Sequence, residues 1–508
     1  MPDLRCRLPG CELIVANRNP TPDTYNLKSK ILTRNPEPGT RNPEPGTRNL
    51  MKRLFGTDGI RGEAGIFPLD EATIRTIGRS LAGRLKALQE TPSTYVPHIV
   101  IGRDTRESGA WIERAFSDGA REAGAVIESA GVITTPGVAF LTRTLPTDAG
   151  VVISASHNPF QDNGIKVFEP SGRKLDDAME RLIESDVQSQ TEDSELPARD
   201  REAEPVNNER SVELRSFYRD YLKYEIGQGL SLSNLRIVVD CANGAAYRFA
   251  PLVLKGLGAR VSVINDWPNG QNINLNCGSL HIESLQDRVV AERADLGVAF
   301  DGDADRALFV DDTGKFVDGD ATLWVLANYL KERGELNGDT VVATVMSNIG
   351  LEIALRSKKG INLARTDVGD RYVLEELLRT GAAVGGEQSG HIIFPKLSLA
   401  GDGIITTLAL IRVLVENKKS LAELTSGFQR YPQILVNVRV REKLPFAEVE
   451  PIARAARDIE ERLGPRGRLL LRYSGTEPLA RVMIEGEAQD SIEQYANELA
   501  SIIKAEIG

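Results

Sequence analysis

Short apolar runs alternate with longer amphipathic stretches along the chain from residue 51 onward. The apolar runs have the length of buried strands, and they occupy residues 98–101, 150–153, 236–239, 296–300, 341–345 and 382–384. Between them, apolar side chains recur at helical spacing, for example over residues 321–331 and 351–355. Strands that alternate with helices predict α/β units.

The pattern changes after residue 433, where strand-like runs in ILVNVRV, RLLLRYS and VMIEG accompany two helices, at 446–463 and at the chain end. This arrangement is typical of an α+β domain. A polar stretch without strand signals at 188–210 predicts a linker. At ~100–200 residues per domain, we expect four domains, at 51–205, 206–312, 313–430 and 431–508.

Residues 1–50 do not share this pattern. The heptapeptide RNPEPGT occurs at 34–40 and again at 41–47, and proline and glycine at that density cannot build a core. The segment also lacks the apolar region of a secretory signal. We expect residues 1–50 to be a disordered extension outside the fold, with Met51 as the true start of the protein.

The composition narrows the range of partners. The 508 residues are 41% hydrophobic and 26% charged, as in a globular protein. With 62 basic and 72 acidic residues the net charge is -10, which argues against a nucleic-acid partner. No apolar run approaches the ~20 residues of a membrane span, so we expect no membrane partner.

The cysteines and histidines narrow the chemistry. The four cysteines, at 6, 11, 241 and 277, fit neither a disulfide scaffold nor a zinc site, which indicates a reducing cytoplasm. Only four histidines are present. A bound metal is therefore expected to have oxygen ligands, as Mg²⁺ does.

Four polar clusters follow apolar runs, at residues 154–159, 301–306, 385–391 and 474–478. Loops at the carboxyl ends of strands are where α/β folds bind ligands. Because each predicted domain contributes one cluster, the four loops together indicate a site in a cleft between domains.

The cluster DGDADR carries carboxylates at Asp301, Asp303 and Asp305, separated by small residues. Such spacing lets all three side chains point at one centre, and a divalent cation would remove their mutual repulsion. An EF-hand loop is excluded because Arg306 and Asp312 stand where it needs glycine and glutamate. A solvated acidic turn is the alternative.

Each of the other clusters has two interpretations. SASHNP is either a turn or a nucleophile at the tip of a strand. GGEQSGH can grip sugar hydroxyls through Glu387 and Ser389, or it is a glycine-rich turn with a core histidine. SGTEP can cradle a phosphate with its flanking arginines, or it is an ordinary turn. In GRDTRESG, we expect Arg103 and Asp104 to form a structural pair.

Six motifs together resemble the α-D-phosphohexomutase superfamily: FGTDGIRG, GRDTRESG, SASHNP with NGIK, DGDADR, GGEQSGH and RYSGTEP. Their order and spacing match that family over about residues 52–508. FGTDGIRG, GEQSGH, VMSNIGLE and VGDRYV resemble its bacterial phosphoglucosamine mutase branch. Phosphomannomutase/phosphoglucomutase enzymes tend to differ at Gln388 and to carry a histidine in place of Asp370.

The resemblance implies a heart-shaped α/β protein of four domains, three related mixed α/β domains and a C-terminal α+β domain. It implies interconversion of glucosamine 6-phosphate and glucosamine 1-phosphate through a phosphoserine enzyme and glucosamine 1,6-bisphosphate. This reaction feeds UDP-N-acetylglucosamine and cell-wall precursor synthesis. The implied enzyme is cytoplasmic, a monomer or homodimer, with one Mg²⁺ per subunit and a sugar phosphate as its partner.

The resemblance also assigns roles to residues of this sequence. Ser156 is the phosphoserine, and its phosphate and three aspartates hold the metal (Asp301, Asp303 and Asp305). Four residues surround the phosphoserine: Arg61, His157, Lys166 and Arg306. Glu387 and Ser389 bind the sugar. The phosphate that does not react is bound by Arg472, Ser474, Gly475, Thr476 and Arg481.

Three other functions are alternatives. A phosphomannomutase/phosphoglucomutase would share the fold and the mechanism. A serine phosphatase would hydrolyse the phosphoserine, but a hydrolase has no need of a second phosphate cradle. A catalytically inactive sugar-phosphate sensor would have no need of Ser156, the three aspartates and Lys166.

Overall fold

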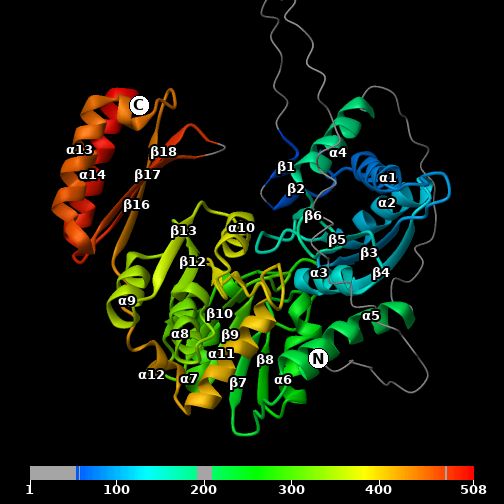
Figure 1. Cartoon of the computed structure of the whole chain (residues 1–508), viewed down its shortest axis with the longest axis horizontal. Coiled ribbons are helices and arrows are strands. Elements are labelled where there is room, and N and C mark those ends of the chain that lie inside the picture. Colours follow the sequence, from blue (N-terminus) through cyan, green and yellow to red (C-terminus); the bar gives the residue numbers. More distant parts are fainter. Residues whose placement is uncertain (1–52, 57, 191–208, 475–476) are drawn as a thin grey trace, which may run out of the picture. The chain divides into compact units, whose positions relative to one another are not determined.

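The computed structural model describes residues 53–56, 58–190, 209–474 and 477–508, which form four β-sheets with their helices (Figure 1). The extension predicted at 1–50 and residues 191–208 of the predicted linker lie outside the described residues. The two ends of that linker are helical, because α4 (Asp177–Gln190) runs into it and α5 (Glu209–Asp220) begins inside it. Among the described residues, none of the helices combines the length and apolar character needed to cross a membrane.

The first sheet has six strands in the order β1-β2-β6-β5-β3-β4. They are β1 (Phe55–Gly56), β2 (Gly59–Glu63), β3 (His98–Arg103), β4 (Val126–Val132), β5 (Ala149–Ile153) and β6 (Asp162–Phe168). Its helices are α1 (Glu71–Ala87), α2 (Gly109–Glu122), α3 (Thr135–Thr144) and α4. Strand β3 pairs in parallel with β4 and β5, and β6 runs antiparallel to β5 and β2.

The second sheet has the order β11-β10-β9-β7-β8. Its strands are β7 (Arg236–Asp240), β8 (Arg260–Ile264), β9 (Leu296–Phe300), β10 (Ala307–Asp311) and β11 (Phe316–Val317). Its helices are α5, which continues into a π-helical segment (Tyr221–Ile226), α6 (Ala250–Gly256) and α7 (Glu283–Glu292). Strand β7 is parallel to β8 and β9, and β10 is antiparallel to β9.

The third sheet has the order β13-β12-β14-β15. Its strands are β12 (Thr340–Thr344), β13 (Asn362–Thr366), β14 (Gly385–Gly386) and β15 (Ile392–Ile393). Its helices are α8 (Gly319–Glu332), α9 (Ile349–Lys359), α10 (Asp370–Thr380), α11 (Gly403–Asn417) and α12 (Leu421–Thr425). Strand β12 is parallel to β13 and β14, and β15 is antiparallel to β14.

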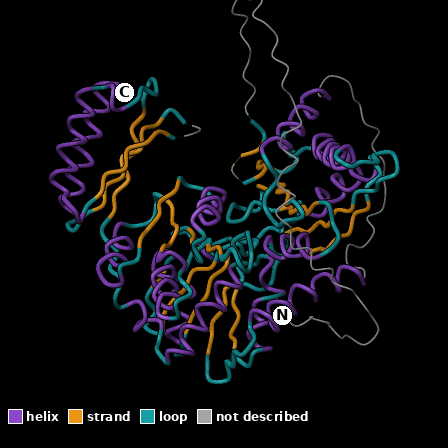
Figure 2. Tube along the Cα trace, in the orientation of Figure 1, coloured by secondary structure: helices purple, strands orange, loops and turns teal. Residues whose placement is uncertain are grey.

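The fourth sheet is antiparallel and has three strands in the order β16-β18-β17. These are β16 (Gln433–Arg439), β17 (Arg468–Tyr473) and β18 (Leu479–Glu485). Helices α13 (Glu450–Leu463) and α14 (Gln489–Ile507) lie together on one face of this sheet (Figure 2). The predicted fold class is confirmed: three mixed α/β sheets and a C-terminal α+β unit.

The three mixed sheets share one topology. In each, one strand (β3, β7 or β12) pairs in parallel with two later strands, and the second of these (β5, β9 or β14) forms a hairpin with an antiparallel strand. The hairpin loops are residues 154–161, 301–306 and 387–391. Three of the four polar clusters found in the sequence therefore occupy equivalent places in three related sheets.

Alternation of side chains along β3 and β5 explains why these strands read as continuous apolar runs. Ile101 and Ile153 pack into the core beneath α1 and α2, whereas Val100 and Val152 pack into the core on the α3 side. All four side chains are fully buried. Burial of each side chain contributes roughly 1.5–3 kcal/mol. Packing on both faces therefore stabilises the sheet independently of its loops.

The strand predicted at 382–384 is wrong, because the third sheet uses Gly385 and Gly386 there instead. A β-carbon on Gly385 would lie 2.7 Å from the carbonyl oxygen of Val342. Glycine has low strand propensity, but here its missing side chain permits a close approach to β12. The other predicted strands agree with the structure to within a few residues.

Candidate active site

Ser156 lies just beyond the end of β5, in the left-handed backbone region with φ of 52°. Its amide donates a hydrogen bond to the Ser154 hydroxyl oxygen at 2.9 Å, and that hydroxyl donates to Asp104 at 2.7 Å. Ser154 therefore fixes the turn, and Ser156 projects its own hydroxyl from it. A left-handed conformation at a non-glycine residue is uncommon and is characteristic of functional sites.

A buried guanidinium holds this turn. Arg106 is 1% exposed, and it donates to the carbonyl oxygens of Ser156 at 3.0 Å and Asn158 at 2.9 Å, and to that of Pro159. Its charge is balanced by Asp104, whose carboxylate lies 2.9 Å from Nε. The expected pair between Arg103 and Asp104 does not form, because Arg103 instead pairs with Glu113 at 2.9 Å.

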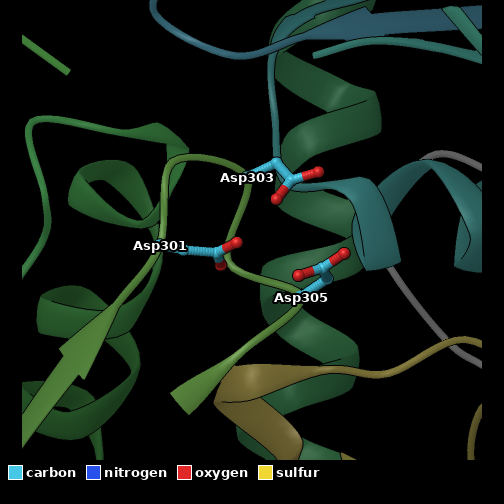
Figure 3. Close-up of side chains that lie close together, drawn as sticks. All are labelled: Asp301, Asp303 and Asp305. Atoms are coloured by element: carbon cyan, nitrogen blue, oxygen red, sulfur yellow. The ribbon is translucent and has the colours of Figure 1, made fainter. Parts of the chain in front are cut away.

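The aspartate loop between β9 and β10 meets Ser156 directly. The Ser156 hydroxyl donates to Asp301 Oδ2 at 2.5 Å. Asp301, Asp303 and Asp305 are all buried, with ligand oxygens within 4.8 Å of one another. Figure 3 shows the three carboxylates close together on one loop. Ala304 adopts a left-handed conformation with φ of 58°, which provides the curl expected from the spacing of the aspartates.

Gly302 lets the aspartate loop and the serine loop touch. A β-carbon at this position would lie 2.5 Å from the carbonyl oxygen of Ser156, closer than real β-carbons approach other atoms. That carbonyl also accepts from Asn274 at 2.9 Å. Any side chain at residue 302 would push the two loops apart.

The charges of the aspartate loop are only partly balanced. Burial, and then repulsion from Asp305 and Asp303, raise the pKa of Asp301 well above its usual range. Buried Oδ1 atoms of Asp303 and Asp305 have no hydrogen-bond partner among the described residues. Unpartnered buried carboxylate oxygens beside a third carboxylate fit a hard cation such as Mg²⁺, and these three side chains could hold one.

Lys166, on β6, faces the same group. Its ammonium lies 3.0 Å from Asp303 Oδ2, 3.5 Å from Asp305 Oδ2 and 3.2 Å from Asp58 Oδ2. Burial alone would lower the pKa of Lys166, but the carboxylates of Asp303 and Asp58 raise it above its usual range. The side chain is 1% exposed, so its positive charge is directed at the buried carboxylates around Ser156.

The remaining residues expected around Ser156 also meet there. His157 Nδ1 lies 3.3 Å from the Ser156 hydroxyl oxygen. Burial, and then the guanidinium groups of Arg306 and Arg61, lower the pKa of His157 to about 4, so its imidazole is neutral near pH 7. The Arg306 amide donates to Asp301 at 3.2 Å, and Arg61 pairs with Asp58.

The loop between β14 and β15 carries the two residues expected to bind sugar. The Ser389 hydroxyl donates to Glu387 Oε2 at 3.2 Å, and the Gly369 amide donates to Glu387 Oε1 at 3.1 Å. The amide of Ala307 donates to the carbonyl oxygen of Gly390 at 3.1 Å. Because Ala307 follows Arg306 directly, this bond joins the sugar loop to the end of the aspartate loop.

The fourth loop follows β17, and its Gly475 and Thr476 lie outside the described residues. Arg472 and Arg481 are paired across β17 and β18, and Arg481 Nη2 lies 3.4 Å from the buried Ser474 hydroxyl oxygen. Burial, and then Arg481, lower the pKa of Arg472. Two neighbouring arginines with few acidic partners fit an anion. In the described part of the chain, no hydrogen bond or ion pair joins this loop to the other three.

The structure adds residues that the sequence patterns did not identify. Asp58 lies within the motif FGTDGIRG, and Arg106 lies within GRDTRESG. Membership of these motifs was the only indication in the sequence that the two residues belong to the site. Thr135 donates to Asp303 Oδ2 at 2.6 Å, and Lys443 donates to the carbonyl oxygen of Ser474 at 2.6 Å. Lys174 contacts Asp58 and Asp370. Nothing in the sequence pattern pointed to these last three.

Comparison with known proteins shows which family the chain is similar to. Four models of the phosphoglucomutase/phosphomannomutase family match the chain: the alpha/beta/alpha domains I at 52–194, II at 217–314 and III at 318–431, and the C-terminal domain at 435–502. Phosphoglucosamine mutase from Solibacter usitatus (strain Ellin6076) is 50% identical over 460 residues, covering 90% of this chain and 100% of that protein. Phosphoglucosamine mutase from Koribacter versatilis (strain Ellin345) is 47% identical over 461 residues, covering 90% and 98%.

Solved structures share the fold. A phosphoglucomutase/phosphomannomutase family protein from Burkholderia thailandensis superposes with a TM-score of 0.71 at 25% identity, over 89% of this chain and 97% of that one. The Aspergillus fumigatus N-acetylphosphoglucosamine mutase, solved with GlcNAc-6P and magnesium, has a TM-score of 0.59 at 17% identity, over 90% and 96%. The identities, the four matched domains and the fold together show that the chain belongs to the phosphohexomutase superfamily and, within it, to the bacterial phosphoglucosamine mutases.

Proposed function

We propose that this protein interconverts glucosamine 6-phosphate and glucosamine 1-phosphate through a phosphoserine at Ser156 and a glucosamine 1,6-bisphosphate intermediate. One observation carries the proposal. The Ser156 hydroxyl, strained into a left-handed turn, donates at 2.5 Å to one of three clustered aspartates. A serine with an ordinary turn role would not be buried against one of three clustered carboxylates whose charges are only partly balanced.

The chain's own residues supply what phosphoryl transfer needs, which is placement and positive charge. The phosphoryl group on Ser156 passes to O1 of glucosamine 6-phosphate, so that the bond from phosphorus to the serine oxygen breaks and a bond to O1 forms. Lys166 and Arg306 offset the charge on the transferred group. His157, at 3.3 Å from the serine oxygen, or Lys166 accepts the proton from O1 and returns it to the serine.

One Mg²⁺ per subunit belongs to this proposal. Asp301, Asp303 and Asp305 would hold it together with an oxygen of the phosphoserine, and the unpartnered Oδ1 atoms of Asp303 and Asp305 support this assignment. When bound, a divalent cation neutralises charge on a transferred phosphoryl group.

The second half of the reaction requires the bisphosphate to turn around, so that its other phosphate faces dephosphorylated Ser156. Glu387 and Ser389 would hold the sugar hydroxyls in both orientations. The phosphate that is not reacting would lie against Arg472, Arg481 and the loop at 474–476. These roles follow the proposed division into domains at 51–205, 206–312, 313–430 and 431–508, each of which contributes one loop.

A cytoplasmic location, as a monomer or homodimer, completes the proposal. The two thiols in the described part of the chain, Cys241 and Cys277, are buried and free, and free thiols persist in reducing compartments. The product would feed the synthesis of UDP-N-acetylglucosamine and cell-wall precursors.

The experiment that tests the substrate is a side-by-side assay of glucosamine, glucose and mannose 6-phosphates with the purified protein and Mg²⁺. The proposal expects the largest kcat/KM with glucosamine 6-phosphate. Faster turnover of the neutral sugars would instead support a phosphomannomutase/phosphoglucomutase. Stoichiometric release of inorganic phosphate would identify a phosphatase.

A further inference from the structure

Lys174, just after β6, lies between two carboxylates that come from distant parts of the chain. Its ammonium contacts Asp58, in the loop between β1 and β2, and lies 2.6 Å from Asp370 Oδ2, at the start of α10. The side chain of Lys174 is 21% exposed, and those of Asp58 and Asp370 are 26% and 19% exposed. This partial burial reduces the screening of their charges by water.

A second ion pair of opposite polarity lies beside the first. Arg371, the next residue on α10, places Nη1 2.5 Å from Asp177 Oδ1, and Asp177 begins α4 three residues after Lys174. Two successive residues of α10 therefore pair with the segment at 174–177. Asp370 does so through its negative charge, and Arg371 does so through its positive charge. This reciprocity fixes the register of the two segments, because sliding either one would bring like charges together.

The Lys174 contact connects the nucleophile to the sugar loop. On one side, Asp58 lies 3.2 Å from the ammonium of Lys166, which lies 3.0 Å from Asp303 in the aspartate loop. On the other side, the residue before Asp370 is Gly369, whose amide donates to Glu387 at 3.1 Å. No other lysine or arginine among the described residues has an ion pair with Asp370.

We propose that Lys174 is a positioning residue for the transfer step, and that its pair with Asp370 sets the placement of the sugar loop relative to Ser156. The inference rests on the proposed function, since it assigns Glu387 to the sugar and Ser156 to the phosphoryl group. Without the ammonium, Asp58 keeps Lys166 and Arg61 as partners and Asp370 keeps His391 at 3.9 Å, but no cation bridges the two carboxylates. The Arg371–Asp177 pair still ties the two segments together, so their relative placement becomes looser.

This role predicts a particular kinetic signature. The residues proposed to grip the sugar and its unreacting phosphate lie in the third and fourth domains, whereas Ser156 lies in the first. Loss of the Lys174 contact therefore leaves the grip on the substrate intact and misplaces the nucleophile. Misplacement of about 1 Å costs about 100-fold in rate, so we expect Lys174→Met to lower kcat by about 10- to 100-fold while KM changes by less than about 3-fold.

The test compares wild type with Lys174→Met, Lys174→Arg, Asp370→Asn and the double variant Lys174→Met/Asp370→Asn in the glucosamine-phosphate mutase assay. Lys174→Arg keeps the charge and should recover most of kcat. The double variant should lose no more than the worse single variant, because both substitutions remove one contact. Arg379→Met is the matched control, since Arg379 is 72% exposed and pairs with Glu376 on the same helix.

The proposal is wrong if Lys174→Met has the same kcat as the Arg379→Met control, or if Lys174→Met changes only KM. It is also wrong if the losses of the two single variants add in the double variant. If Lys174→Met does not fold, kcat and KM of Lys174→Arg and Asp370→Asn are compared with those of wild type instead. If wild type turns over another hexose phosphate and not glucosamine phosphate, the proposed substrate fails. The same series on the preferred hexose phosphate then decides the role of Lys174.

Discussion

Substituting alanine for Gly302 tests whether the contact between the aspartate loop and the serine loop matters for transfer. The added β-carbon would lie 2.5 Å from the Ser156 carbonyl oxygen, 2.7 Å from Ile273 Cδ1 and 3.0 Å from Asn274 Nδ2. Two of these neighbours are themselves in contact, because Asn274 donates to the Ser156 carbonyl at 2.9 Å. The methyl group therefore cannot be accommodated unless the surrounding atoms move.

The size of the effect follows from these distances. Real β-carbons essentially never approach within 3.0 Å of another atom, so the two loops must separate by at least the difference between 2.5 and 3.0 Å, which is 0.5 Å. This shift stretches the Ser156–Asp301 hydrogen bond from its present 2.5 Å. Overpacking of this kind costs about 1–3 kcal/mol of stability, and a displacement approaching 1 Å costs about 100-fold in rate.

The assay measures kcat/KM for glucosamine 6-phosphate and the free energy of unfolding in urea, with Gly83→Ala as the matched control. Gly83 lies within α1, and a β-carbon there would meet nothing within 4 Å. Gly83→Ala should keep full activity and gain about 0.5–1 kcal/mol. Gly302→Ala should fold, lose about 1–3 kcal/mol and lose about 10- to 100-fold in kcat/KM. Wild-type activity in Gly302→Ala would refute the close-contact reasoning.

Three further predictions concern charges around Ser156. Arg106→Met should lower the free energy of unfolding in urea by about 3–5 kcal/mol, because Asp104, with no exposed surface, loses its cation. The double variant Arg106→Met/Asp104→Asn should recover part of this loss. A loss below about 1 kcal/mol in Arg106→Met would contradict the buried pair. NMR titration of unphosphorylated protein should give His157 a pKa of about 4, against 6.5 for an unperturbed histidine. The unfolded chain then binds the proton more readily, so the stability due to neutral His157 is lost as pH falls from 6.5 toward 4; an equal acid sensitivity in His157→Gln would count against this. Asp303→Asn should abolish the rise in melting temperature that Mg²⁺ causes and lower mutase activity by at least about 100-fold, whereas exposed Asp312→Asn should change neither; a Mg²⁺ response retained by Asp303→Asn would remove it from the metal site.

The four loops could be predicted from sequence because each combines a local apolar run with a polar cluster. The strand ending at Ile153 and the one at Leu296–Phe300 are buried on both faces, and runs of this kind are visible without tertiary information. The close spacing of the three aspartates is likewise a property of one short loop. What the sequence could not provide was the equivalence of three hairpins, which depends on how the strands of each sheet are ordered.

Residues that act across the fold escaped prediction for the same reason. Arg106 reaches carbonyl oxygens about 50 positions away along the chain. Lys174 follows a strand of the first sheet and pairs with Asp370, which begins a helix of the third sheet. A lone lysine or arginine in a polar segment has no local pattern that distinguishes a buried clamp from a solvated side chain. Gly385 and Gly386 were missed as a strand because their pairing depends on a close approach to Val342 that only the folded sheet reveals.

Following the phosphoryl group itself tests whether Ser156 carries it during the reaction. Enzyme phosphorylated with isotopically labelled phosphate is mixed with unlabelled glucosamine 6-phosphate, and the label is located by peptide mass spectrometry and in the sugar products over a single turnover. We expect label on Ser156 at the start, transfer of the label to glucosamine 1,6-bisphosphate, and no labelling or mutase activity in Ser156→Ala. Label on another residue, or mutase activity in Ser156→Ala, would contradict the assignment of Ser156 as the phosphoserine.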